Sequence, residues 1–185
     1  AFGSAYFLDY DNDGFLDLLL AGEGLALLHN DGGGGFDDRS ALFPEGKRTG
    51  GAIALSDTDR DGDVDLLVLR SGDGGGERLQ LLRNDGGNVN QYLRVELKAL
   101  GAGSGKNNAF GIGARLELRT GELYQSRVAT GPVTYFGLGR HLKADVLRVI
   151  WPNGVPQTIY FPGSDQNVLE EQVLKSSCLF LYAWN

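Results

Sequence analysis

An aspartate-rich loop with a fixed spacing constrains this chain more than any other feature. Residues 57–65 read Asp-Thr-Asp-Arg-Asp-Gly-Asp-Val-Asp, with carboxylates at positions 1, 3, 5 and 9 and Gly62 at position 6. So dense a set of oxygen ligands suits a cation of the size of calcium, which takes about six to eight oxygens from carboxylates and carbonyls. The glycine permits the sharp bend that turns the carbonyl of position 7 inward.

The same pattern occurs 48 residues earlier, over residues 9–17. The sequence therefore predicts two calcium sites, each with side-chain oxygens from four aspartates and a main-chain carbonyl from position 7. The predicted metal ligands are Asp9, Asp11, Asp13, Phe15 and Asp17 in the first loop, and Asp57, Asp59, Asp61, Asp63 and Asp65 in the second.

Two other interpretations of the loops fit less well. Asp and Gly both form turns, so a single copy could be an ordinary turn, but two copies in matching contexts argue against that reading. An EF-hand opens with the same spacing but needs a glutamate at position 12, where this chain has Leu20 and Val68. The residues that follow, 15–20 and 64–69, are short and apolar like buried strands. We therefore predict calcium loops between strands.

Residues 1–89 form an internal repeat. Each loop leads through two apolar strands to a similar turn, Asn30-Asp31-Gly32 in one copy and Asn84-Asp85-Gly86 in the other. A period near 48 with about four strands per unit is the size of a β-propeller blade. Two blades alone leave open sheet edges, which further blades or another chain would cover.

Residues 90–175 follow a different pattern and are predicted to form a small antiparallel β domain. Residues 92–98 alternate between apolar and charged, as a half-buried strand does. Further strands are expected at 114–119, 123–129, 133–136, 145–151, 157–160 and 168–173. An apolar strand is expected at 176–185. The predicted fold class is all-β, with two propeller-type blades followed by this domain.

The two halves resemble two known families. The loops with their flanks, Gly3-Ser-Ala-Tyr-Phe-Leu-Asp and Gly51-Ala-Ile-Ala-Leu-Ser-Asp, resemble the FG-GAP (VCBS-type) repeat, a calcium-loop propeller blade of integrin α chains and secreted bacterial proteins. The second half resembles the ASPIC/UnbV domain in Gly111-Ile-Gly-Ala-Arg-Leu-Glu-Leu, Phe136-Gly-Leu-Gly and Val149-Ile-Trp-Pro-Asn-Gly, although Ile150 stands where that family usually has Arg. The combination is typical of the cartilage acidic protein-like and bacterial UnbV-like proteins. It implies no catalytic residues.

Composition excludes several classes of protein. Hydrophobic residues make up 42% of the chain but form no long run, so no membrane span is expected. The net charge of −7 includes eight predicted side-chain ligands among 24 acidic residues, and no basic patch indicates nucleic acid. The single cysteine, Cys178, excludes an internal disulfide. The absence of Met and of a signal peptide suggests a mature form or a fragment.

No residue pattern indicates an enzyme. His29 is expected in a surface turn because the other copy has Arg83 there, His141 is expected in solvent, and Cys178 is expected to be inert in an apolar strand. The aspartates could imitate a glycosidase pair, but a carboxylate bound to calcium stays ionised and cannot donate a proton.

Two functional hypotheses remain. The first is a non-catalytic, extracellular, calcium-stabilised module for adhesion, scaffolding or self-assembly, with protein partners, or copies of itself, bound through open sheet edges and residues 179–184; a carbohydrate ligand stays open. The alternative is an accessory part of a secreted carbohydrate-active enzyme. An extracellular or cell-surface location is expected because such loops should bind calcium weakly, at roughly 10⁻⁴–10⁻³ M.

Overall fold

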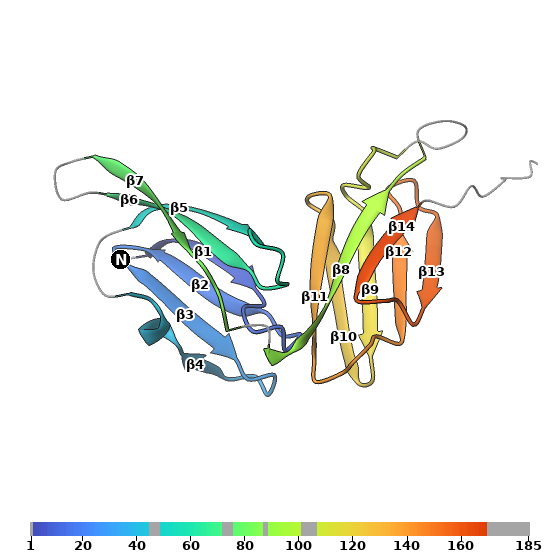
Figure 1. Cartoon of the computed structure of the whole chain (residues 1–185), viewed down its shortest axis with the longest axis horizontal. Helices are drawn as coiled ribbons and strands as arrows, with labels where there is room; N and C mark the ends of the chain where they lie inside the picture. The colour runs from blue at the N-terminus through green and yellow to red at the C-terminus, as the bar shows by residue number, and fades with distance from the viewer. Residues whose placement is uncertain (1, 45–48, 72–75, 87–88, 101–106, 170–185) are drawn as a thin grey trace, which may run out of the picture.

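The computed structural model describes residues 2–44, 49–71, 76–86, 89–100 and 107–169. Within these residues the protein is all-β, as predicted, with four sheets and one short 3-10 turn. The strands form two groups that lie side by side, β1–β7 in one and β8–β14 in the other (Figure 1). No helix in this part of the chain is long and apolar enough to cross a membrane.

The first sheet is an antiparallel meander in the order β1-β2-β3-β4, the arrangement expected of a propeller blade. Its elements are β1 (Phe2–Leu8), β2 (Asp17–Gly22), β3 (Leu25–Asn30), β4 (Phe36–Asp38) and the 3-10 turn η1 (Ser40–Leu42). Along β2 every second residue is buried, starting with Asp17, because successive side chains of a strand point to opposite faces.

The second sheet has the order β5-β6-β7, with β5 (Thr49–Ser56), β6 (Asp65–Ser71) and β7 (Glu77–Leu82). The repeat predicts about four strands, but this sheet has three among the described residues. After its third strand the chain continues into the other group instead of adding an outer strand (Figure 1). The two sheets do not close a propeller. They share one apolar cluster built on five buried residues: Leu8, Leu19, Leu27, Leu66 and Val68.

The second group consists of two sheets that face each other across a core. One has the order β10-β9-β12-β13 and the other β11-β8-β14. The strands are β8 (Gln91–Lys98), β9 (Arg115–Thr120), β10 (Leu123–Val128), β11 (Val133–Gly139), β12 (Val146–Ile150), β13 (Pro156–Tyr160) and β14 (Asp165–Leu169). Trp151 and Phe136 are the largest fully buried side chains. The Trp151 indole N–H donates to Oε1 of Gln157 at 3.0 Å, which satisfies its one polar atom.

All but one of the strand pairs are antiparallel. The exception is β14, which runs parallel to β8, with Val168 opposite Leu97. The alternation of residues 92–98 shows which face of β8 is buried but not which strand lies beside it, so this pairing could not be inferred. The predicted apolar strand at 176–185 lies outside the described residues.

Candidate metal centre

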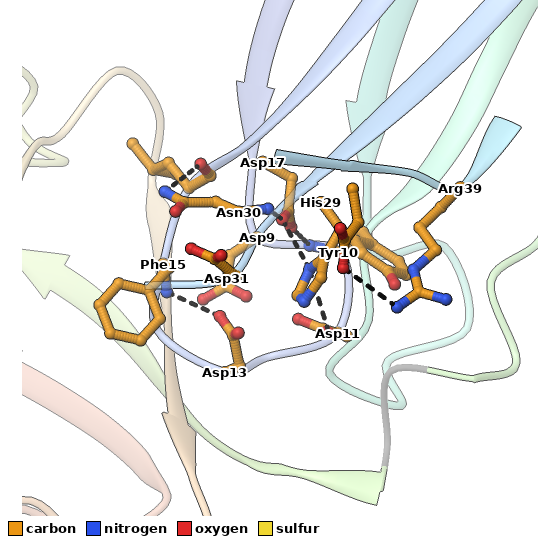
Figure 2. Close-up of polar contacts among 12 residues, drawn as sticks. Asp9, Tyr10, Asp11, Asp13, Phe15, Asp17, His29, Asn30, Asp31 and Arg39 are labelled. Atoms are coloured by element: carbon orange, nitrogen blue, oxygen red, sulfur yellow. Dashed lines mark hydrogen bonds and ion pairs between the residues drawn. The ribbon is translucent and has the colours of Figure 1, made fainter. Parts of the chain in front are cut away.

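The first aspartate-rich loop connects β1 to β2 and gathers its carboxylates into a cluster (Figure 2). Asp9, Asp11 and Asp13 each present one carboxylate oxygen within 4.8 Å of the others. The second loop connects β5 to β6 and brings together Asp57, Asp59 and Asp61 in the same way. The structure thus brings positions 1, 3 and 5 of each predicted ligand set to one point.

Some carboxylate oxygens of the two loops are buried without a hydrogen-bond donor. Oδ1 of Asp9 and Oδ1 of Asp11 are buried without a hydrogen bond, as is Oδ1 of Asp57 in the second loop. Burial, together with the charges of Asp13 and Asp11, raises the pKa of Asp9 to about 8. Burial also raises the pKa values of Asp11 and Asp13. Buried acceptors without donors are costly, and a cation coordinated by these oxygens would remove that cost. The donor set therefore fits a hard cation.

The aspartates at position 9 tie each loop to the rest of its blade. The Tyr10 N–H donates to Oδ2 of Asp17 at 3.0 Å and the Asn30 N–H donates to Oδ1 at 2.8 Å. The equivalent bonds to Asp65 come from the N–H groups of Thr58 and Asn84, at 2.9 and 2.8 Å. Both side chains are fully buried. Each carboxylate oxygen can accept a second partner, so the predicted role of both residues as ligands remains a prediction.

Each loop owes its tight shape to left-handed backbone at two positions. Gly14 and Gly62, at position 6, have φ of 95° and 97°, the bend that the sequence predicts. Asn12 and Arg60, at position 4, also have positive φ, 57° and 65°. Asparagine tolerates this conformation, but nothing about an arginine signals it.

Main-chain hydrogen bonds inside the two loops are nearly identical. The N–H of position 6 donates to Oδ2 of position 1, from Gly14 to Asp9 at 3.0 Å and from Gly62 to Asp57 at 3.2 Å. The N–H of position 7 donates to Oδ1 of position 5 in both loops. The roles of the Phe15 and Asp63 carbonyls as ligands stay predictions.

In each blade a basic side chain lies beside the metal loop. It is His29 in the first blade and Arg83 in the second. Nδ1 of His29 is 3.1 Å from Oδ1 of Asp17 and 3.6 Å from Oδ2 of Asp11 (Figure 2). In the second blade Arg83 pairs with Asp59 at 3.2 Å. His29 is thus no plain surface turn residue. His29 and Arg83 occupy equivalent positions of the repeat. The presence of a basic residue at both positions was a signal that each lies beside the aspartate at position 3 of its own loop, Asp11 or Asp59.

Asp63 also has a side-chain role that its spacing does not reveal. It is 1% exposed, and its Oδ1 accepts a hydrogen bond of 2.9 Å from Nδ2 of Asn12, in the other loop. The same Nδ2 donates to the carbonyl of Gly62 at 3.1 Å. The expectation that only the carbonyl of Asp63 matters is therefore incomplete, because its side chain joins the two loops.

The remaining candidates for chemistry do not join the cluster. His141 is exposed, as expected. Cys178 lies outside the described residues. The basic side chains paired with loop carboxylates include His29 in the first blade and Arg83 in the second.

Both halves of the chain match known protein families. Residues 9–68 match the FG-GAP-like repeat family, and residues 103–174 match the family of ASPIC and UnbV domains. Neither family is known to be catalytic. Cartilage acidic protein 1 of Mus musculus is 35% identical over 124 residues, and that of Homo sapiens is 34% identical over 124 residues. Each alignment covers 62% of this chain.

The chain spans only 18% of the mouse protein and 17% of the human protein, so it corresponds to a small part of these relatives. The order of the two matched regions agrees with the order of the two groups of strands. The chain thus carries a region that matches the FG-GAP-like repeat, followed by a region that matches the ASPIC/UnbV domain, in the order that the sequence predicts.

Proposed function

We propose that this chain is a non-catalytic, extracellular structural module whose blades are stabilised by two calcium ions. The observation that carries the proposal is the pair of equivalent loops in which buried carboxylate oxygens converge without hydrogen-bond donors. The match to the FG-GAP-like repeat supports calcium as the ion, because such repeats generally bind it. Hard oxygen donors also favour calcium over softer metals.

The proposal is tested by calorimetric titration of the protein with calcium, alongside thermal unfolding with and without chelator. At calcium near 100 times Kd, each site adds about 2.7 kcal/mol to the free energy of unfolding. For a chain of this length that corresponds to a rise in Tm of about 5–11 °C per site. If the Tm is the same with and without chelator and calorimetry detects no heat of calcium binding, the proposal is contradicted.

Single substitutions assign the two sites. Asp11→Ala and Asp59→Ala should each reduce the calcium stoichiometry by one. Asp37→Ala, an exposed acid in the same first blade but outside the loop, is the matched control and should leave it unchanged. Magnesium and zinc titrations check the identity of the ion, because His29 beside Asp11 offers a nitrogen donor that zinc accepts readily.

The proposed extracellular location rests on the expected affinity of the loops for calcium. Loops of aspartates that lack the position-12 glutamate should bind calcium at roughly 10⁻⁴–10⁻³ M, which suits extracellular calcium and not the cytosol. A nanomolar Kd in the same titration is the contrary result.

Self-association or partner binding through sheet edges is the second part of the proposal. The supporting observation is that β7 ends its sheet where the first blade has a fourth strand, and its Leu79 and Leu81 are 65% and 48% exposed. An open edge offers unpaired N–H and C=O groups to an added strand. Light scattering of the intact chain and of a chain lacking residues 176–185 tests this. A monomer in both cases rules out self-assembly and leaves further blades as the partners of the edge.

A further inference from the structure

The two groups of strands have separate cores and meet at the metal loops. The buried cluster of the blades and that of the C-terminal domain share no residue. The hydrogen bonds and close contacts across the boundary include the first loop, residues 9–17, and Asp57 and Gly62 of the second. The backbone that gathers the carboxylates therefore also contacts the C-terminal domain.

Three consecutive carbonyls of the first loop each hold a different part of the chain. The carbonyl of Tyr10 accepts from Nδ2 of Asn84 in the second blade at 2.6 Å. That of Asp11 accepts from Nδ2 of Asn90, which precedes β8, at 2.8 Å. That of Asn12 accepts from the main-chain N–H of Gly139, at the end of β11, at 2.8 Å.

The backbone of β11 packs closely against the first loop at Gly137. A Cβ atom there would collide with Oδ2 of Asp9 and lie 2.5 Å from the carbonyl carbon of Asn12. The carbonyl of Gly137 is fixed in turn by Nε2 of Gln125 at 2.6 Å. This backbone approach to a predicted ligand is possible because residue 137 has no side chain.

Polar side chains of the C-terminal domain also reach both loops. Arg127 on β10 lines the same pocket as Asp9, so a cation of this domain lies near the first ligand. Tyr135 on β11 hydrogen-bonds the side chain of Asp57. The ring of Tyr92 on β8 packs against Gly62.

From these contacts we infer that the ASPIC/UnbV domain is part of the first metal site: β11 positions Asp9 and Asn12, so that calcium binding to the first loop and docking of the domain depend on each other. Gly137 and Gly139 are the positioning residues. Without the ion, the buried oxygens of Asp9 and Asp11 that have no hydrogen-bond partner favour opening of the loop to solvent, which carries the Asn12 carbonyl away from Gly139. The inference rests on the proposed calcium binding and adds a function for it, which is to fix the domain on the blades.

Amide hydrogen exchange at Gly139, read by NMR, tests the coupling directly because this N–H donates across the boundary. If calcium binds the docked state alone, opening is suppressed by the factor 1 + [Ca]/Kd, so calcium at ten times Kd slows exchange about elevenfold. The amide of Val149, inside the C-terminal core, is the control and should not respond. Calcium binding by calorimetry without slower exchange at Gly139 overturns the inference and leaves the proposed function standing. No calcium binding at all refutes the proposed function instead.

Coupling between two sites is reciprocal, so a substitution that disturbs the boundary must lower the affinity of the first loop for calcium. Gly137→Ala should weaken calcium binding to the first loop about 10–100-fold, the usual range for residues that orient metal ligands. The same titration reads the affinity of the second loop, which the domain contacts through Tyr92 and Tyr135. Gly131→Ala, in the same domain, is the matched control because a Cβ there meets nothing within 4 Å.

If Gly137→Ala disrupts the domain, its loss of near-UV dichroism reveals this, and the exchange experiment on the unmodified chain still decides. A folded Gly137→Ala protein with unchanged affinity at both loops overturns the inference.

Discussion

Replacement of Asn12 by alanine is the sharpest test of how the two loops are joined. Asn12 is 2% exposed, and its Nδ2 donates both to Oδ1 of Asp63 and to the carbonyl of Gly62. The substitution removes both donors at once and leaves a carboxylate and a carbonyl buried. It touches no predicted ligand side chain of the first loop, so its effect reports on the connection between the loops.

The magnitude follows from the two bonds. A hydrogen bond to a charged group contributes about 1.5–3 kcal/mol and a neutral one about 1 kcal/mol. Asn12→Ala should therefore lower the free energy of unfolding by about 2.5–4 kcal/mol. In a chain of this length that corresponds to a fall in Tm of about 5–16 °C.

Arg60→Ala is the matched control. Arg60 occupies position 4 of the second loop with nearly the same φ, but its side chain is exposed. Both variants place alanine at nearly the same left-handed φ, but asparagine tolerates this conformation better than arginine, so added strain contributes to the loss at Asn12 only. Thermal and urea unfolding at saturating calcium measure the difference. The reasoning is refuted if the two variants agree to within about 0.5 kcal/mol, the usual range of surface substitutions.

Three further predictions concern the site and the core. In the presence of chelator, the free energy of unfolding should fall as pH rises from about 4 to about 8. The raised pKa of Asp9 means that the folded chain binds more protons than the unfolded chain in that window. Asp9→Asn should flatten this pH dependence, as measured by urea unfolding. Asp63→Ala should cost less in an Asn12→Ala background than in the unmodified chain, since the two side chains share one bond, as a double-mutant cycle would measure. Leu147→Ala, in the C-terminal core, should lower the free energy of unfolding by about 2–5 kcal/mol, whereas Tyr160→Ala, at 73% exposure, should change it little.

Sequence reasoning reached the features that depend on local spacing. The aspartates at positions 1, 3 and 5 converge as expected because a nine-residue loop with a glycine bend allows few arrangements of its carboxylates. The apolar strands that follow begin at Asp17 and Asp65, slightly later than predicted, because the residue at position 8 still belongs to the loop.

The features that depend on how distant segments meet were not predictable. The period of 48 residues shows that Asn12 and Arg60 are equivalent, but it does not show that Asn12 faces Asp63 in the other loop. In the same way, the glycines in the Phe-Gly-Leu-Gly segment marked a family resemblance. Only the structure shows that Gly137 packs on Asp9. The contact joins two domains, and the alternating pattern of a strand does not show which part of another domain it meets.

The departure of the second blade from the first explains why the C-terminal domain meets the metal loops. In the first blade β4 begins at Phe36, and the equivalent position in the repeat, 54 residues later, is Asn90. There the chain enters β8 instead of forming a fourth strand, and Nδ2 of Asn90 donates to the Asp11 carbonyl. Among the residues that the structure describes, this change of direction leaves the edge of β7 open and also brings β8 and β11 against the loops. The open edge and the calcium-dependent docking proposed above both follow from this change of direction. A strand added to β7 should consequently alter the contacts of Asn90 and, through the Asp11 carbonyl, the first metal site.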